Sequence, residues 1–564
     1  MILTDRIRDI MRRARSRKDS LANEYENGGW RAHHYDLSRF LLNRRGKYLA
    51  QKDYEPNDGF KINQDINNST PEEAIHTASA GLMGGFTSPS IPWVNIIPQD
   101  QDLRDYKPAQ EYLWRQQSFM YEVLNTSNWY TVLPQIYDEI LAFGQGAMRI
   151  DIHDVKTIHC TQYTAGSYYL GNGSDGSLDT VCYRYPRTVR NLVDTYGIDN
   201  VTQKTRDSYN KKVPELDRWV KCANLIETNG KDRDRNFADW RGMRYRAITW
   251  EEDAGQEEPP LKMGGHNIFP VVAPRIGRRS EEIYGSSRGM RALTDARQIQ
   301  SEERRASEAL SKMINPPMNI PANLRRADLR AGGQNRYRGQ RADAIRPSID
   351  LNGFPYQAIM DTIARRERKL EDVLGASVFK QFQLLDETGN HNMTVPEVQE
   401  RKSEKYQLLG PMQQSIHQEL LQPAIEIIWN HMATLGRLEE PPPELAEMPL
   451  KIQFTSSLAL EQLSAITDSI RRFGLVVGEL NQYYPGASDN YDVDVAVGEM
   501  SQGWVLPPQL MRDQGAVDEI RNQRAIALEE ERAMEQQAND AKAARDLGAA
   551  PLGGGTALDA VAAG

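Results

Sequence analysis

The chain has 564 residues, with 69 basic and 78 acidic side chains and a formal net charge of −9. Hydrophobic residues make up 39%, which is enough for several packed domains of roughly 150 residues each and excludes a wholly disordered chain. The acidic balance argues against a protein that coats nucleic acid, because such proteins are usually basic.

The spacing of the cysteines and the hydropathy of the chain indicate the cellular compartment. The three cysteines, Cys160, Cys182 and Cys222, lie far apart, which favours a reducing environment over a disulfide framework. The basic N-terminus has no apolar signal-peptide core, and no apolar run is long enough to span a bilayer. We therefore expect a protein that is made and kept in a cytoplasm, without a membrane partner.

The first part of the chain is predicted to be helical. In residues 1–50, apolar side chains recur at helical spacing with arginines between them. This basic stretch fits a solvated helix face, which we favour, or a surface for an anionic partner. Residues 72–148 are also helix-rich, with a loop or tight turn expected at 81–93, where Gly, Ser and Pro concentrate.

A β-rich region follows. Residues 147–186 alternate between apolar and polar side chains, and the Asn-Gly and Asp-Gly pairs within 168–181 predict a hairpin turn. Thr188 is expected to cap a helix that ends at Gly197. Further strands are expected around 217–226, 243–250 and 268–274.

The rest of the chain is mainly helical. One long helix at 286–314 ends at Pro316-Pro317. Then come a basic, irregular insertion (315–357), a second helix (357–378), a polar loop (380–392) and a long helical region (394–436) with kinks at Gly410-Pro411 and Pro423. One strand (451–456), three more helices (459–483, 489–500 and 507–548) and a disordered tail (549–564) complete the chain. The fold class is therefore α+β, mainly helical.

No motif predicts catalysis. The sequence has no P-loop, no G-x-S-x-G and no H-E-x-x-H. Gly171, Gly173 and Gly176 spell G-x-G-x-x-G, but no helix follows them, so a hairpin turn is favoured over a dinucleotide site. His153 and His159, together with the three cysteines, lack the spacing of a zinc site and are interpreted as strand and core residues.

Two further groups have alternative interpretations. Asp492 and Asp494 are interpreted as a solvated helix start rather than a metal-binding pair, and His33-His34 is expected to be exposed. With Glu499, the two aspartates define an alternative function as a divergent metal-dependent nuclease. The favoured reading is a protein that is not an enzyme and that has no catalytic residue, metal or cofactor.

Seven segments of the chain carry a family resemblance. They are ASAGLMGGFTSPSIPWVNI (78–96), LAFGQGAMRI (141–150), the hairpin with TVRNLVDTYG (188–197), 284–318, 393–445, IQFTSSLALEQ (452–462) and RNQRAIALEEER (521–532). These segments resemble, in the same order, the head-to-tail connecting proteins of short-tailed phages (podoviruses), which are portal proteins. One departure is Pro396 in MTVPEV (393–398), where the family usually has an M-T-A-T-E-V-like start, and this departure puts the length of the preceding loop in question.

The resemblance implies a portal fold that forms a ring, commonly of twelve subunits, at one capsid vertex of the virion, assembled in the host cytoplasm. The implied domains are a wing (1–280), a stem helix (281–314), a clip (315–356), a second stem helix (357–378), a tunnel loop (379–393), wing and crown helices (394–483), crown or barrel helices (484–548) and a disordered tail (549–564). The main alternative within phage biology is another ring or core protein of the virion.

The resemblance also implies partners and candidate residues. Double-stranded DNA would pass non-specifically through the channel during packaging and ejection. The terminase large subunit and later tail adaptor or nozzle proteins would dock, and the major capsid protein and scaffold would surround the ring. The clip candidates, for the DNA channel or for a protein interface, are Arg325, Arg326, Arg330, Arg336, Arg338 and Arg341. The tunnel-loop candidates, for which a plain solvated loop is favoured on composition, are Lys380, Gln381, Gln383, Asn390, His391 and Asn392.

Overall fold

The chain contains two compact units, which are described separately. The first comprises Met1–Asn95, Ser118–Glu439 and Ile452–Ala459, and the second comprises Ile96–Gln117, Glu440–Lys451 and Leu460–Gly564. The computed structural model describes residues 5–50, 66–100, 103, 106–255, 258–320, 327–330, 333–335, 345–348, 355–380, 410–445, 450–454, 457–484, 486–503, 508–512, 514–548, 551–552 and 555–556.

The N-terminal region is helical, as the sequence predicts. Its elements are α1 (Asp5–Asn27), α2 (Trp30–Leu41), η1 (Asn43–Arg45), α3 (Gly46–Ala50), α4 (Thr70–Phe86), α5 (Lys107–Thr126) and α6 (Trp129–Phe143), with strand β1 (Val94–Pro98) between α4 and α5.

The loop expected from residue 81 is wrong in its first part, because α4 continues to Phe86. The reason is a tertiary contact. A Cβ atom on Gly81 would lie 2.1 Å from the ring of Phe379, so glycine here makes room for an aromatic side chain rather than breaking the helix.

Two antiparallel sheets form the β-rich region. The first has the order β3-β2-β9 and the second the order β4-β5-β6-β7-β8. The bounds are β2 (Ala147–His153), β3 (Thr157–Tyr163), β4 (Tyr168–Asn172), β5 (Leu178–Thr188), β6 (Trp219–Thr228), β7 (Tyr245–Glu251), β8 (Lys262–His266) and β9 (Val271–Val272). Between β5 and β6 lie α7 (Val189–Tyr196) and α8 (Gln203–Asn210), and Thr188 caps α7 as predicted.

Helix α1 packs on the five-stranded sheet. Its buried side chains, Met11 and Tyr25 among them, share one apolar core with Tyr168 and Trp250 of the strands. This arrangement also explains part of the basic stretch. Arg13 lies 3.0 Å from Asp232, and other cations of α1 bind the loop that follows β7, while Arg6 and Arg12 are exposed.

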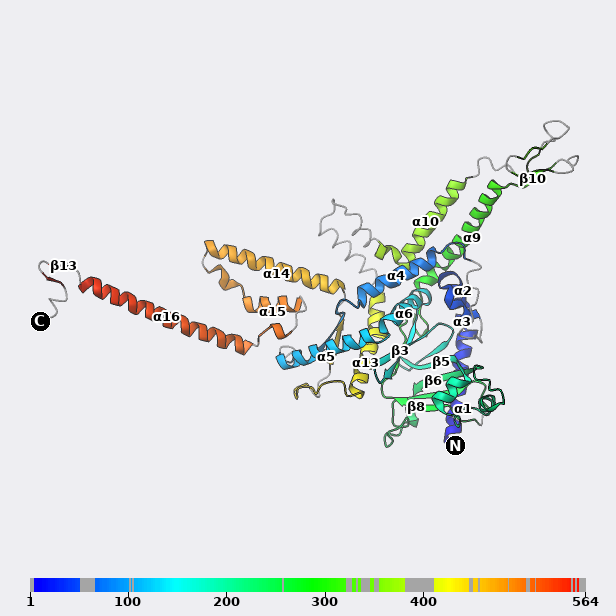
Figure 1. Cartoon of the computed structure of the whole chain (residues 1–564), viewed down its shortest axis with the longest axis horizontal. Helices are drawn as coiled ribbons and strands as arrows, with labels where there is room; N and C mark the ends of the chain where they lie inside the picture. The colour runs from blue at the N-terminus through cyan, green and yellow to red at the C-terminus, as the bar shows by residue number, and fades with distance from the viewer. Residues whose placement is uncertain are drawn as a thin grey trace. The chain divides into compact units, whose positions relative to one another are not determined.

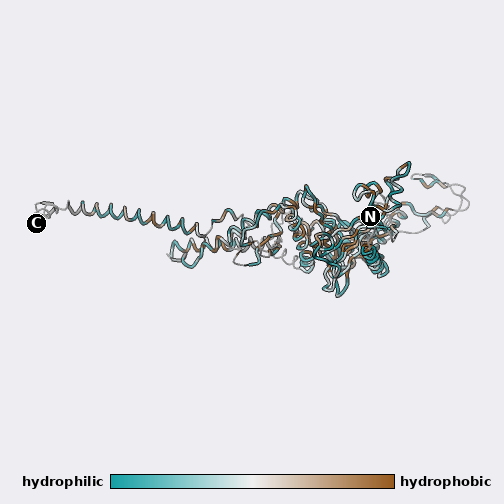
Figure 2. Tube along the Cα trace, turned by 90° about the horizontal axis from the view of Figure 1, so that it is seen from below, coloured by the Kyte–Doolittle hydropathy of each residue, from teal (hydrophilic) through white to brown (hydrophobic). Residues whose placement is uncertain are grey.

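The remaining described elements are mostly helices. They are α9 (Arg288–Ile314), β10 (Met318–Asn319), β11 (Arg346–Pro347), α10 (Tyr356–Leu374), the π-helical turn η5 (His417–Leu421), α13 (Gln422–Thr434), β12 (Leu450–Phe454), α14 (Ser457–Tyr483), α15 (Val493–Gly503), α16 (Gln514–Gly548), β13 (Pro551–Leu552) and β14 (Gly555–Thr556), with 3-10 turns η3 (Gly230–Asp232), η6 (Ala487–Asn490) and η7 (Pro508–Leu510). Figure 2 shows that hydrophilic residues predominate along the C-terminal helix. Among the described residues, no helix is both long and apolar enough to cross a membrane.

Candidate functional site: a helical hairpin and its basic insertion

Helices α9 and α10 lie side by side and form a hairpin, with β10 and β11 at its far end (Figure 1). The 27 residues of α9 correspond to a helix of about 40 Å. Both helices lie where the sequence predicts them, and the buried apolar side chains of α9 lie between Ala292 and Ala306. Such a hairpin is a rigid way to project an insertion from a domain.

The base of α9 is built on the end of α6. The Ser287 hydroxyl accepts a hydrogen bond from the N–H of Met290 and donates one to the carbonyl of Ala142, both at 2.8 Å. A Cβ atom on Gly285 would lie 2.2 Å from the carbonyl oxygen of Gly144. Gly144 and Gly285 therefore allow a close backbone crossing that larger residues would prevent.

Charged side chains join the two helices of the hairpin. Arg366 of α10 donates to both carboxylate oxygens of Glu302 at 2.9 and 2.8 Å, and also reaches Asp295 at 2.9 Å. The hydrogen bonds to Glu302 hold the pKa of Arg366 above its usual value. Lys369 adds a second contact to Asp295 at 2.8 Å. A forked arginine–carboxylate pair fixes geometry as well as charge, so this contact sets the relative register of the helices.

A polar junction ties the hairpin to the segment before α4. The Gln300 side chain accepts from the N–H groups of Asn67 and Asn68 at 2.7 and 2.9 Å and donates to the carbonyl of Asn68 at 2.8 Å. Asn68 also donates to Glu367 of α10 at 2.8 Å. One short segment therefore holds both helices of the hairpin.

The insertion at the tip of the hairpin is closed by a small antiparallel ribbon. Met318 of β10 pairs with Pro347 of β11, and the Ser348 N–H donates to the carbonyl of Pro317 at 2.7 Å. Of the clip candidates, Arg330 is exposed on a turn that Asp328 stabilises. The others lie outside the described residues: Arg325, Arg326, Arg336, Arg338 and Arg341.

Of the tunnel-loop candidates, Lys380 alone lies within the described residues. Residues 376–380 form a helical turn after the left-handed Gly375, so Lys380 lies on a helix rather than in a loop. Its ammonium group lies 2.7 Å from the carboxylate of Glu371. The candidates outside the described residues are Gln381, Gln383, Asn390, His391 and Asn392.

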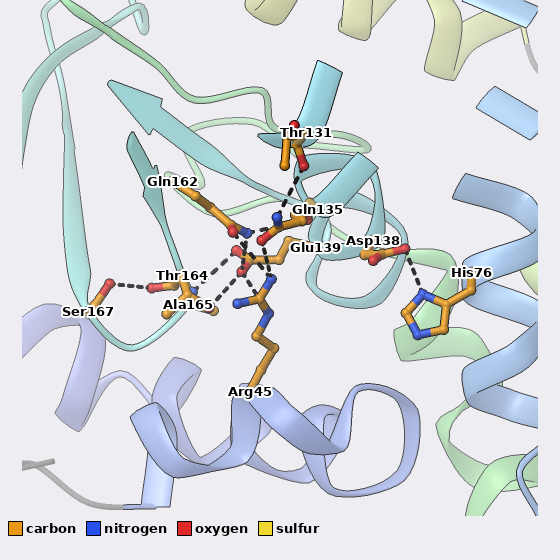
Figure 3. Close-up of polar contacts among 10 residues, drawn as sticks. All are labelled: Arg45, His76, Thr131, Gln135, Asp138, Glu139, Gln162, Thr164, Ala165 and Ser167. Atoms are coloured by element: carbon orange, nitrogen blue, oxygen red, sulfur yellow. Dashed lines mark hydrogen bonds and ion pairs between the residues drawn. The ribbon is translucent and has the colours of Figure 1, made fainter. Parts of the chain in front are cut away.

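A buried carboxylate of α6 joins this helix to η1 and to the end of β3 (Figure 3). Glu139 accepts hydrogen bonds from Thr164 at 2.6 Å and Gln162 at 3.1 Å, and lies 3.4 Å from Arg45. Burial raises the pKa of Glu139 to about 7, although Arg45 opposes the shift. Next to it on α6, Asp138 contacts the exposed His76 at 3.2 Å and raises the pKa of this histidine. The sequence interpretation did not single out Glu139, although an acidic residue that leads into the apolar run ILAF is a signal of a buried carboxylate.

The histidines and cysteines considered for a zinc site lie on strands β2, β3, β5 and β6. All three cysteines are buried and unbridged, and burial raises the pKa of Cys160 and of Cys182 to about 12. His153 accepts hydrogen bonds from backbone N–H groups of its own turn. No group of His, Cys, Asp and Glu side chains within the described residues could hold a metal ion.

Two other predictions have different outcomes. The glycines around residue 173 form the turn between β4 and β5, as expected. His34 is fully buried, so its predicted exposure is wrong; its Nδ1 lies 2.9 Å from the Tyr25 hydroxyl, and burial lowers its pKa to about 3. The aromatic environment around α2 accounts for this burial, since Trp30, Tyr284 and Phe143 surround the imidazole.

The acidic pair at the start of α15 is a helix cap, as predicted. Asp492 accepts hydrogen bonds from the N–H groups of Asp494 and Val495 at 3.0 and 3.1 Å. Arg521 of α16 binds both oxygens of Asp494 at 2.7 and 2.6 Å. Both carboxylates therefore have partners within the described helices.

Comparison with known proteins identifies the family. The family model described as "Bacteriophage head to tail connecting protein" matches residues 12–511. The chain is 32% identical over 543 residues to the portal protein of Salmonella phage epsilon15, covering 95% of each chain. It is 29% identical over 514 residues to a probable portal protein of Bordetella phage BPP-1, covering 90% of each.

Solved structures give weaker similarity. A chain from the neck of an empty gene transfer agent particle matches with a TM-score of 0.29 and 12% identity, covering 81% of this chain and 95% of that one. A chain from a native gene transfer agent virion matches with a TM-score of 0.28 and 9% identity, covering 75% and 98%. The sequence relatives and the family model are decisive, and the chain belongs to the bacteriophage head to tail connecting protein family.

Proposed function

We propose that this chain is the portal subunit of a phage, which assembles as a ring, of twelve subunits by analogy with the family, at one capsid vertex. The carrying observation is the α9–α10 hairpin with a ribbon-closed insertion at its tip. In this assignment the hairpin is the stem, residues 315–356 the clip, 379–393 the tunnel loop and 1–280 the wing. Residues 394–483 would complete the wing and crown, and 484–548 would form crown or barrel.

The charge distribution supports a channel through which DNA slides. The chain carries a net charge of −9, whereas residues 315–356 contain seven arginines against three aspartates. Each phosphate contact releases counterions and strengthens binding, and symmetry multiplies every contact, so a basic channel throughout would hold DNA instead of letting it move. A mostly acidic ring with local basic zones would centre the duplex at low friction.

The same zones suit protein partners. Arginine is enriched at protein interfaces, so the insertion would dock the terminase large subunit during packaging and tail adaptor or nozzle proteins afterwards. The major capsid protein and scaffold would contact the ring from outside. The ring would do no chemistry itself, and the terminase would supply ATP hydrolysis.

Light scattering combined with negative-stain imaging of the purified protein tests this proposal. We expect rings with a central hole and a mass of about twelve times the 64.1 kDa chain, because a heterologous interface that closes produces cyclic symmetry. Co-expression with scaffold is the second condition, for the case that the ring needs it. A compact dimer under both conditions would contradict the proposal.

A further inference from the structure

One arginine of the first unit is buried at the meeting point of three chain segments. Arg275 follows β9, and its side chain is only 2% exposed. Its guanidinium donates to Asn172 at the end of β4 at 2.5 Å and to the carbonyl of Gly176 in the β4–β5 turn at 3.5 Å. On its other side it reaches Glu419, which lies 144 residues away in the chain.

The contact with Glu419 uses both backbone and side chain. The Arg275 N–H donates to Oε2 at 2.8 Å, Nε donates to the same oxygen at 3.2 Å, and Nη2 donates to Oε1 at 3.4 Å. Breaking such a contact would leave a buried charge without its partner, which is strongly unfavourable. The pair is therefore a firm connection between β9 and the helix that carries Glu419.

Glu419 lies in an unusual part of its helix, the π-helical turn η5. The N–H of Gln422 bonds to the carbonyl of His417, five residues back instead of four. Pro423 follows at once and has no N–H for the carbonyl of Glu419, so the wider turn accommodates the proline. Single π turns inside helices are often found at functional sites, and here the turn carries the carboxylate that binds Arg275.

The residues next to Arg275 also hold the base of the hairpin. The Ile276 N–H donates to the carbonyl of Gly144, and the Ser286 N–H donates to the carbonyl of Ile276, both at 2.8 Å. Arg275 is thus one residue from the backbone bonds that fix the start of α9. Through residues 275–276, the π turn and the base of the hairpin share one support.

Resting on the proposed function, we propose that Arg275 is a positioning residue for DNA translocation. It fixes the π turn to residues 275–276, which hold the base of the stem. It thereby keeps the helix that begins at residue 410, after the proposed tunnel loop, in one register while DNA moves past. Loss of the charge on Glu419 frees residues 410–421, which comprise the π turn and the helical residues before it, without removing the hairpin or the ring.

The test compares Glu419→Gln with the same substitution in a second buried arginine–glutamate pair. Glutamine keeps the size of the side chain and one acceptor for the Arg275 N–H, but removes the charge. The control is Glu252→Gln, because Glu252 binds the Arg184 fork at 2.7 and 2.8 Å in the five-stranded sheet. We measure hydrogen exchange of residues 410–421 in assembled rings and the fraction of DNA-filled particles after complementation of a portal-deficient phage.

We expect Glu419→Gln to leave ring mass unchanged, to speed exchange in 410–421 at least tenfold, and to lower the fraction of filled particles at least tenfold. Arg275→Lys, which keeps the charge but loses the fork, should act in the same way. Glu252→Gln should leave both quantities as in the wild type. Pro423→Ala restores the missing N–H, should convert the π turn to regular helix, and should also lower filling; it serves if the other variants do not fold.

Three outcomes overturn the inference. The first is unchanged exchange in Glu419→Gln rings, and the second is faster exchange with normal filling. The third is normal filling by Pro423→Ala with an altered turn. If wild-type rings form but particles that contain them never fill, the proposed portal function fails instead, so the two failures are distinguishable.

Discussion

The five-stranded sheet with α1 buries its large apolar side chains, whereas the helices of the second unit leave many of theirs exposed. In the sheet, Trp250 and Tyr168 are 1% exposed. In α14, Phe473 is 57% and Tyr483 is 79% exposed, and α15 and α16 expose further large apolar side chains. The first region completes its core within one chain. The second leaves large apolar side chains uncovered in the single chain.

The largest expected effect is on the completed core. Trp250→Ala should lower the free energy of unfolding by about 3–5 kcal/mol, the usual cost of removing a large buried aromatic side chain. Urea unfolding followed by circular dichroism measures it. Phe473→Ala is the matched control and should change stability by less than about 0.5 kcal/mol. Equal losses in the two variants would remove the contrast between the regions.

The next effect depends on pH and concerns Glu139. Because its pKa rises from 4.5 to about 7 on folding, the folded protein binds a proton that the unfolded chain has released between these values. Stability from this group is therefore complete below pH 4.5 and is lost as the pH rises through about 7. The full difference has an upper bound of about 3 kcal/mol.

Glu139→Gln should remove this slope. The measurement is the unfolding free energy of variant and wild type between pH 5 and 8, and the prediction concerns their difference. Taking the difference matters because His34, with a pKa lowered to about 3, destabilises the fold as the pH falls below 6.5, in the opposite direction. A difference that does not vary with pH would show that Glu139 titrates normally.

The smallest expected change in chain stability concerns two exposed side chains of α14, whose loss should nevertheless weaken the assembled ring. The double variant Phe473→Ser, Tyr483→Ser should change the stability of the chain by less than about 0.5 kcal/mol per site, yet rings should dissociate at a lower urea concentration, because urea weakens apolar contacts. Val155→Ser is the control, since Val155 is 78% exposed on the β2–β3 turn. Rings as robust as those of the wild type would show that this surface faces water or another partner.

Much of the fold could be predicted because its signals are local. The long helix at 286–314, the prolines that follow it and the Asn-Gly and Asp-Gly turn each rest on signals within a few residues of the structure they specify. Local signals of this kind predicted both hairpin helices and the β-rich region, and the kink expected at Pro423 coincides with the π turn that precedes this proline. Most of the candidate arginines and tunnel-loop residues, by contrast, lie outside the described residues, so their roles stay predictions.

The failures share one physical cause. Gly81 looks like a helix breaker until the ring of Phe379 occupies the space beside it, and His34 looks solvated until Tyr25 and Phe143 enclose it. The family, the helices and strands and the basic insertion follow from the amino-acid sequence, because periodicity, caps and turns act over short distances. The Glu139 network and the Arg275–Glu419 contact become visible only in the folded chain, because the partners of a buried charge lie far away in the sequence.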